Sequence, residues 1–365
     1  MKNIKNIFCT NFKYWFWIYF YIIIFGITCF TLILQFTINI DNTYRPNFLK
    51  NGVEIGHRGY PLTARDNSLM GLYEAKRHNL TIVECDLYIT KDNVIVVSHD
   101  HKVKNGGHIK DYTFKELNKY SYKQDSVVVT LEKAKLTQND KITEESLNKK
   151  NSIIKKNNKL IHNKNVEEKK IVNFDEFIKV AKKLNLKLDL DLKNVPLVKT
   201  FIFVQNIHKI LEKYDYQSNI IVSSFYLHIS YAWRSMYNTY FIFLFEIDYV
   251  YNEYIDKLNS SDTNSIYIDI LKLLNTFYNY TIYYIANALH VNAIGFNIVE
   301  NIEEYLNKYS EQDLLFWTSN NKIEKTIVKN ILDSNQYNNG DNKEKLIYSI
   351  SDCPNKYCKR IINNY

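Results

Sequence analysis

Short apolar runs recur along the chain from residue 53 onward, and stretches with helical periodicity separate most of them. The clearest helical stretches are 67–78 and 173–184, and the second places Phe174, Phe177 and Ala181 on one face. Strands that alternate with helices favour a parallel α/β fold. The nine strand-like runs are 53–57, 82–88, 94–98, 186–192, 220–224, 241–245, 293–296, 314–318 and 346–350.

Eight βα units would close into a barrel, so nine runs are one too many. The additional strand lies within 82–98, where Lys91, Asp92 and Asn93 indicate a turn between two adjacent strands. The fold class that we expect is therefore α/β, a TIM (β/α)8-like barrel that spans residues 50–358.

Two stretches stand apart from this alternation. Residues 121–170 contain twelve Lys and seven Asn but neither Gly nor Pro. Their apolar content cannot offset a backbone ordering cost of roughly 1–2 kcal/mol per residue, so we expect a Lys/Asn-rich, low-complexity insertion that is poorly packed. Residues 266–298 are highly apolar, but Asn and His interrupt them. A barrel helix is favoured there, with a second membrane span as the alternative.

The amino-terminal segment 1–39 has the pattern of a membrane anchor. Residues 14–38 carry no charge, and a helix of 25 residues exceeds the roughly 30 Å of bilayer hydrocarbon. Lys2, Lys5 and Lys13 precede this run, so the positive-inside rule predicts a single-pass membrane protein whose remaining chain is lumenal or extracellular. A cleaved signal peptide is the alternative. Its apolar core is usually about 7–15 residues, which favours a retained N-terminal transmembrane helix, a signal-anchor.

Composition and charge change this picture little. The net charge of +8 fits attraction to an anionic membrane surface, but Lys residues spread over a solvated surface explain it as well. No RNA- or DNA-binding signature accompanies the charge, so we expect no nucleic acid partner.

Histidines lie at the ends of two strand-like runs. His57 follows the first run, with Arg58 beside it, and His99 follows the third. Catalytic side chains of parallel barrels come from the carboxyl ends of strands. An imidazole titrates near neutrality, so His57 and His99 form a candidate acid–base pair. A lone histidine at a strand end is often structural, and the case therefore rests on the whole group of residues.

Acidic residues repeat with the period of a strand. Glu84 and Asp86 share one face of the second run, and Asp189, Asp191 and Lys193 share one face of the fourth. Charges inside a barrel are costly unless they are paired or bound to a metal. Oxygen ligands suit hard cations, so we expect a divalent cation, Mg²⁺ or Ca²⁺, beside these acids.

In this order, the motifs resemble those of the glycerophosphodiester phosphodiesterase family. The specific part is His57-Arg58-Gly59, Asp66-Asn67-Ser68, Glu84-Cys85-Asp86 and His99-Asp100. Weaker segments follow in the same order: Asp191-Leu192-Lys193, Ser223-Ser224-Phe225, Trp317-Thr318-Ser319-Asn320 and Ser351-Asp352-Cys353-Pro354. The resemblance spans about residues 53–355, and the anchor makes the chain similar to the single-anchor membrane branch that hydrolyses glycerophosphoinositol.

The resemblance implies a role for each matching position. These roles are metal binding for Glu84, Asp86 and Asp191, acid–base catalysis for His57 and His99, contacts to phosphate oxygens for Arg58 and Lys193, and packing against the glycerol for Trp317.

Three features depart from the family pattern. Asp66 and Asp191 stand where the family has Glu. The loop after His99-Asp100 is shortened to Lys104-Asn105-Gly106-Gly107 and lacks an Arg- and Thr-rich stretch. Because that loop shapes the substrate pocket, substrate specificity does not carry over.

The expected function is that of a membrane-anchored, metal-dependent phosphodiesterase. It would hydrolyse glycerophosphodiesters such as glycerophosphoinositol or glycerophosphocholine to glycerol phosphate and an alcohol. One alternative is phospholipase D-like hydrolysis of lysophospholipids or N-acyl glycerophospholipids. Another is an inactive, membrane-anchored scaffold or lipid-binding protein, which the retention of both histidines and all three acids disfavours. The expected partners are a small-molecule glycerophosphodiester or lysolipid substrate and a membrane.

Overall fold

The computed structural model describes most of the chain from residue 21 to residue 352. The described residues are 21–22, 24–38, 40, 42–103, 106–119, 171–246, 265–298, 312–320, 322–333 and 346–352. The predicted insertion 121–170 and the first part of the predicted anchor lie outside these residues, so both stay predictions.

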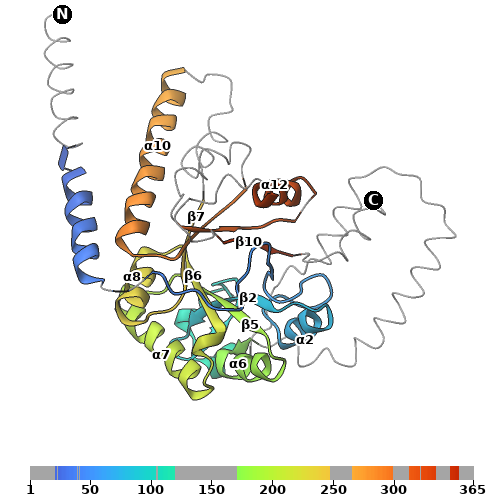
Figure 1. The fold of residues 1–365 in the computed structure, drawn as a ribbon. Coiled ribbons are helices and arrows are strands. Elements are labelled where there is room, and N and C mark those ends of the chain that lie inside the picture. Colours follow the sequence, from blue (N-terminus) through green and yellow to red (C-terminus); the bar gives the residue numbers. More distant parts are fainter. Residues whose placement is uncertain are drawn as a thin grey trace, which may run out of the picture.

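Eight parallel strands close into a barrel, as the sequence predicted (Figure 1). Closure is made by β1, which pairs with β10 on one side and with β2 on the other. The eight strands are β1 (Glu54–Gly56), β2 (Ile82–Ile89), β5 (Lys187–Leu192), β6 (Ile220–Ser224), β7 (Phe241–Phe245), β8 (Ala293–Phe296), β9 (Asp313–Phe316) and β10 (Ile347–Ser351).

The additional strand also lies where the sequence predicted it. β3 (Ile95–Val97) pairs antiparallel with β2. The turn between them contains Asn93 at φ 63, and the Thr90 backbone N–H donates to the Val94 carbonyl at 3.0 Å. A tenth strand was not predicted: β4 (Val172–Asn173) pairs antiparallel with β3 and has only two residues, too few to produce a pattern.

Helices lie between the barrel strands, and their caps explain where the two predicted ones begin. Ser68 accepts a hydrogen bond from the Gly71 backbone N–H, and Asn173 accepts one from that of Glu176. The helices are α2 (Leu69–Arg77), α3 (Phe114–Leu117), α6 (Phe174–Lys183), α7 (Thr200–Lys213), α8 (Leu227–Met236), α10 (Ser265–Ala288) and α12 (Lys322–Asp333), with short 3₁₀ turns η1 (Ile109–Asp111), η2 (Leu197–Lys199) and η3 (Gln217–Asn219).

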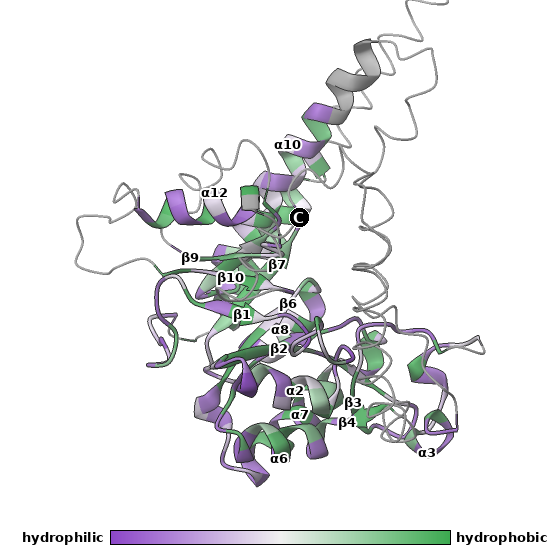
Figure 2. Ribbon diagram, turned by 90° about the vertical axis from the view of Figure 1, so that its right-hand side faces the viewer, coloured by the Kyte–Doolittle hydropathy of each residue, from purple (hydrophilic) through white to green (hydrophobic). Residues whose placement is uncertain are grey.

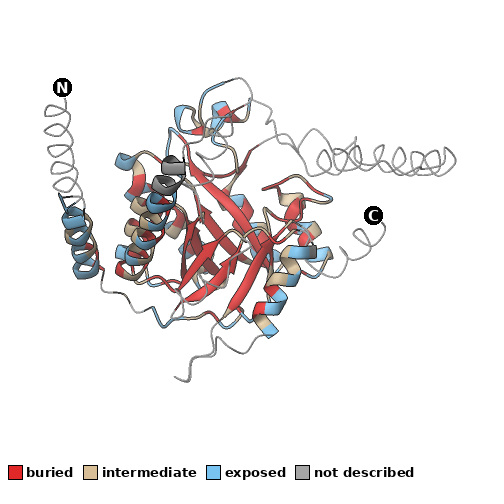
Figure 3. Ribbon diagram, turned by 90° about the horizontal axis from the view of Figure 1, so that it is seen from above, coloured by how far each residue is buried: buried red, intermediate tan, exposed pale blue. Residues whose placement is uncertain are grey.

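The hydrophobic core lies between the strands and the helices. Figure 3 shows the strands as the most buried elements, and Figure 2 shows polar residues in purple on helices such as α6 and α12. In α6, Phe174, Phe177 and Ile178 are fully buried, as the helical spacing predicted. At the amino-terminal end of the strands, Asp313 closes the barrel interior and pairs with Arg45. This packing leaves the opposite end of the barrel available for a functional site.

The two apolar stretches of the sequence form helices where the structure describes them. Residues 24–37 are helical, and Leu34 and Ile38 at their end are buried against the core. The stretch 266–298 forms α10 followed by β8, which agrees with the favoured barrel-helix interpretation. Within the part of the chain that the structure describes, no helix combines the length and the apolarity needed to cross a membrane.

Candidate active site

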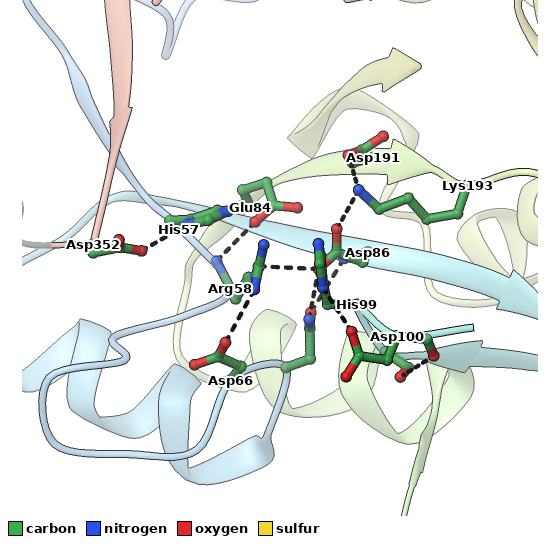
Figure 4. A network of polar contacts seen from close by, with 12 residues as sticks. His57, Arg58, Asp66, Glu84, Asp86, His99, Asp100, Asp191, Lys193 and Asp352 are labelled. Carbon is green, nitrogen blue, oxygen red and sulfur yellow. Dashed lines mark hydrogen bonds and ion pairs between the residues drawn. The ribbon is translucent and has the colours of Figure 1, made fainter. Parts of the chain in front are cut away.

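Three carboxylates meet inside the barrel near the carboxyl ends of two neighbouring strands (Figure 4). Glu84 and Asp86 lie on β2, and Asp191 lies beside Asp86 on β5. One oxygen from each lies within 4.8 Å of the others, and the three residues are only 2%, 1% and 5% exposed. The three acids that the sequence assigned to metal binding therefore lie together, and their binding of a cation stays a prediction.

Lys193 lies between two of these acids. Its Nζ is 2.7 Å from Asp86 Oδ1 and 2.5 Å from Asp191 Oδ2. The other oxygen of Asp191, Oδ1, is buried and has no hydrogen-bond partner among the described residues. A buried carboxylate oxygen without a donor is costly, and a divalent cation would remove that cost. The carboxylates present therefore fit a Mg²⁺ or Ca²⁺ site.

Burial and charge shift the pKa values of these groups in opposite directions. Burial, together with the charges of Asp86 and Asp191, raises the pKa of Glu84 well above its ordinary value. Burial would also raise the pKa of Asp86, but the Lys193 and Arg58 cations outweigh it and lower that pKa. Burial raises the pKa of Asp191. The raised pKa values of Glu84 and Asp191 show that burial and mutual repulsion make their charged forms costly, and a bound divalent cation would offset both effects.

Arg58 takes part in this charge network through both its backbone and its side chain. Its backbone N–H donates to Glu84 Oε2 at 2.7 Å, and φ is 51, a conformation that few non-glycine residues adopt. The guanidinium lies 3.2 Å from Asp66 Oδ2 and 3.5 Å from Asp86 Oδ2. Arg58 thus places positive charge next to the carboxylates, where the sequence predicted a phosphate contact.

Glycine residues permit the tight turn that presents His57 and Arg58. Gly59 has a φ of 102, which favours glycine. A Cβ at Gly56 would lie 2.5 Å from the Gly59 carbonyl oxygen, so no larger residue fits. The glycine of the His-Arg-Gly motif is therefore required by the backbone conformation of this turn.

Asn67 fixes the position of Asp86. Its Nδ2 donates to Asp86 Oδ2 at 2.6 Å, and its Oδ1 accepts from the Asp86 backbone N–H at 3.1 Å. Asn67 has a φ of 55, which asparagine tolerates better than most residues. Asn67 therefore holds the Asp86 carboxylate in place through two hydrogen bonds.

The two histidines reach the same end of the barrel by different routes (Figure 4). His57 follows β1, and its Nδ1 lies 2.5 Å from Asp352 Oδ1. His99 follows β3, which folds back so that the Ser98 backbone N–H donates to the Asp86 carbonyl at 2.9 Å. The Nδ1 of His99 lies 3.0 Å from Asp100 Oδ1. Each Nδ1 faces a carboxylate, so Nε2 is the ring atom that each histidine can offer to a substrate.

The remaining candidate, Trp317, lies directly after β9. Its ring packs edge-on against Phe225 with centroids 5.3 Å apart, and Lys193 Nζ lies 6.0 Å from the centre of the Phe225 ring. Trp317 Nε1–H is buried without a hydrogen-bond partner among the described residues. The tryptophan therefore lies near the charged group, and its contact with a glycerol stays a prediction.

Sequence reasoning did not assign several residues that the structure places in the site. Asp352 and Asn320 belong to two of the weaker family segments, but nothing in their local sequence indicated that Asp352 contacts His57 or that Asn320 contacts Asp352. Asp352 Oδ2 accepts from Asn320 Nδ2 at 2.6 Å, and its backbone N–H donates to Asn320 Oδ1 at 2.9 Å. Burial would raise the pKa of Asp352, but the hydrogen bond with His57 outweighs it and lowers that pKa.

The fold and the site together define a (β/α)8 barrel with a candidate metal-binding group and two histidines at the carboxyl ends of its strands. Residues 57–330 match the Glycerophosphoryl diester phosphodiesterase family, and the chain belongs to that family of enzymes. The chain is also similar to YhdW of Bacillus subtilis (strain 168), named as a candidate glycerophosphodiester phosphodiesterase. The two are 41% identical over 69 residues, which cover 18% of this chain and 28% of that relative.

Solved structures share the fold. A candidate glycerophosphoryl diester phosphodiesterase from Silicibacter pomeroyi has a TM-score of 0.56 at 14% identity, with 86% of this chain and 94% of that chain covered. An Oleispira antarctica phosphodiesterase in complex with the product sn-glycerol-3-phosphate has a TM-score of 0.54 at 15% identity, with 86% and 97% covered. At these identities the likeness shows the barrel fold and no more.

Proposed function

We propose that the protein is a metal-dependent glycerophosphodiester phosphodiesterase that releases glycerol phosphate and an alcohol. The observation that carries the proposal is the convergence of Glu84, Asp86 and Asp191 beside His57 and His99 at one end of the barrel. The family to which the chain belongs supports the reaction class. The product named in the Oleispira structure supports the substrate class.

The charged residues would bind the phosphodiester. Arg58 and Lys193 lie beside the carboxylates and would face the anionic phosphate oxygens, where positive charge stabilises the transition state. Glu84, Asp86 and Asp191 would hold Mg²⁺ or Ca²⁺, which would add further positive charge next to the phosphate. Trp317 would cover one side of the bound glycerol.

The histidines would move the protons. Nε2 of one imidazole takes a proton from the attacking hydroxyl, which is water or a hydroxyl of the substrate's own glycerol. A new P–O bond forms as the P–O bond to the alcohol breaks, and Nε2 of the other imidazole protonates the departing oxygen. Attack by water gives glycerol phosphate directly, whereas attack by the glycerol hydroxyl gives a cyclic phosphodiester that water then opens to glycerol phosphate. Burial lowers the pKa of His99, which favours the neutral imidazole near pH 7. Asp352 and Asp100 keep each ring oriented through Nδ1.

The test is turnover by the full chain purified in detergent. Glycerophosphoinositol, glycerophosphocholine and a lysophospholipid are supplied before EDTA, after EDTA, and after Mg²⁺ or Ca²⁺ is restored. We expect hydrolysis of a glycerophosphodiester that EDTA abolishes and metal restores, and no hydrolysis by a Glu84→Gln, Asp86→Asn variant.

A matched control changes two acids outside the site. Asp175→Asn with Glu176→Gln alters the first turn of α6 and should retain turnover. Full activity of the Glu84→Gln, Asp86→Asn variant would refute the assignment. Hydrolysis of the lysophospholipid alone would favour the phospholipase D-like alternative.

We further propose that residues 14–38 anchor the protein in a membrane, with residues 40–365 on the lumenal or extracellular side. The uncharged run supports this proposal, as do large apolar side chains in its described part, where Phe25 is 71% and Phe36 86% exposed. Protease added to the cytosolic side of sealed vesicles should leave residues 40–365 intact. Their digestion would contradict the orientation, and recovery of the protein in the soluble fraction would contradict the anchor.

A further inference from the structure

An exposed apolar patch lies where β5 leads into α7. It consists of Leu197 and Val198 in η2, which are 72% and 89% exposed, and of Phe201 and Ile202 in the first turn of α7, which are also exposed. Residues three and four apart are neighbours on a helical surface, so the four side chains share one side of this turn. Among the described residues outside helix 24–37 and α10, the other exposed large apolar side chains occur singly.

The apolar exposure is confined to the start of α7. Further along the same helix the exposed side chains are charged, namely those of Lys209, Glu212 and Lys213. The inner side of the first turns is packed, since Phe203 and Val204 are fully buried. The barrel core therefore does not account for the four outer side chains, and an exposed apolar cluster on a folded domain is typical of a contact surface.

The patch lies at the end of the barrel that carries the candidate active site. β5 contributes Asp191 and Lys193 to that site, and the patch begins four residues beyond Lys193. Lys199 holds this segment against the end of β2, because its Nζ donates to the Thr90 and Lys91 carbonyls at 2.9 Å. The patch is therefore fixed at the carboxyl ends of the strands.

The proposed membrane anchor leads toward the same end of the barrel. Its described part, residues 24–37, ends where Ile38 is buried against the core, near the amino ends of the strands. Asn292, at the start of β8, donates to the Asn42 carbonyl at 2.7 Å and to the Tyr44 carbonyl at 3.0 Å. α10 ends at the same place because it leads into β8. Figures 1 and 3 show helix 24–37 beside α10, so both helices extend from this place toward the carboxyl ends of the strands.

A membrane surface suits the charges around the patch. No Asp or Glu lies between Asp191 and Glu212, and the charged residues in this interval are Lys193, Lys199 and Lys209. Insertion of the patch would therefore bury no carboxylate of this segment, and a lysine can keep its ammonium group in water while its stem contacts apolar surface. Large apolar side chains flanked by basic residues are typical of surfaces that bind at a membrane interface.

We propose that the patch formed by Leu197, Val198, Phe201 and Ile202 inserts into the surface of the lipid bilayer that holds the anchor. The patch is then a second membrane contact, and the carboxyl ends of the barrel strands face the bilayer. The inference adds an interaction surface to the proposed function. It rests on the proposed anchor for the direction of the membrane, and on the exposure and position of the four side chains for the contact itself.

The test measures quenching of tryptophan fluorescence by lipids with brominated acyl chains, in vesicles that contain the full-length protein. Val198→Trp adds a reporter at the most exposed position of the patch. Lys209→Trp is the matched control, at an exposed position of α7 outside the patch. After subtraction of the wild-type signal, we expect brominated lipid to quench the added fluorescence of Val198→Trp by roughly half, because a surface helix reaches the boundary between headgroups and acyl chains. The added fluorescence of Lys209→Trp should not change.

The wild-type protein tests the anchor separately, because Trp15 and Trp17 lie within the proposed anchor. Quenching of the wild type without quenching of the fluorescence added by Val198→Trp would overturn the inference and leave the anchor standing. The reverse result would support the patch and contradict the anchor, and quenching of neither would contradict both. A spectral shift of Val198→Trp that depends on protein concentration and not on brominated lipid would show that a second copy of the chain covers the patch, which also overturns the inference.

Discussion

Replacing Asp352 by Asn tests whether the carboxylate next to His57 sets the proton position on the imidazole. Asn320 is fixed, because its Oδ1 accepts from the Asp352 backbone N–H at 2.9 Å, which leaves its Nδ2 to donate to Asp352 Oδ2. An amide at position 352 must therefore turn its oxygen toward Asn320. Its NH₂ then faces His57 Nδ1, which has to accept rather than donate.

The Asp352→Asn substitution therefore favours the His57 tautomer that has its proton on Nε2 rather than on Nδ1. The proton moves to Nε2 of His57, the atom that the proposed mechanism uses. The lost charge-assisted hydrogen bond alone is worth about 1.5–3 kcal/mol, or roughly 10- to 150-fold in rate. With the tautomer also reversed, we expect kcat to fall by about 10²–10⁴, the usual contribution of general acid–base catalysis, with a smaller change in KM.

The assay measures kcat and KM of Asp352→Asn against Asp175→Asn, a control that also removes a paired carboxylate. The exchange variant Asp352→Asn, Asn320→Asp gives the sharper test. In it, position 352 can donate its NH₂ to the new carboxylate and accept from His57 Nδ1–H with its oxygen, so part of kcat should return. Wild-type kcat in the single variant would refute the reasoning, as would a folded exchange variant no faster than the single one.

Three further predictions concern stability. Asn67→Ala loses the hydrogen bond to Asp86 and puts Ala at a positive φ, so the free energy of unfolding measured by urea titration should fall by roughly 3–5 kcal/mol. Asn67→Gly should be about 1–2 kcal/mol more stable than Asn67→Ala, because glycine tolerates the positive φ. Burial raises the pKa of Asp189 to about 8, so the folded protein holds a proton that the unfolded chain releases. Stability should therefore fall as pH rises from about 4 to 8, and Asp189→Asn should flatten this slope in EDTA; an unchanged slope would contradict it. Arg45→Ala leaves buried Asp313 without its cation and should cost about 2–4 kcal/mol with kcat unchanged, because the pair lies at the end of the barrel opposite the site; a loss of kcat would contradict that separation.

The strand pattern predicted the barrel because parallel strands buried on both faces read as nearly continuous apolar runs. All nine predicted strands are present, and the turn around Asn93 separates β2 from β3 as expected. The pattern could not reveal β4, whose two residues are too few to show a period. Its pairing with β3 is a tertiary effect that no local signal carries.

Within the site, the sequence predicted best which side chains share a face of a strand, because that follows from the two-residue period of a strand. Glu84 and Asp86 share a face because they are two residues apart, and β5 repeats the spacing with Asp191 and Lys193. The contacts made by loops were not predictable in the same way. Asn67 meets Asp86 only because its positive φ turns the chain back toward β2, and nothing in its local sequence distinguishes that conformation from an ordinary turn.

The pair of His57 and Asp352 shows why the rest required the structure. These residues are 295 positions apart, yet each directly follows a strand, and those strands, β1 and β10, are the two that meet where the barrel closes. Gly56 pairs with Ser351, and the His57 backbone N–H donates to the Ser351 carbonyl at 3.0 Å, so the register of this seam sets the distance between the two side chains. A shift of one residue in that register would place the two side chains on opposite faces of the sheet. The orientation of His57 therefore depends on completion of the whole barrel, which a motif of neighbouring residues cannot encode.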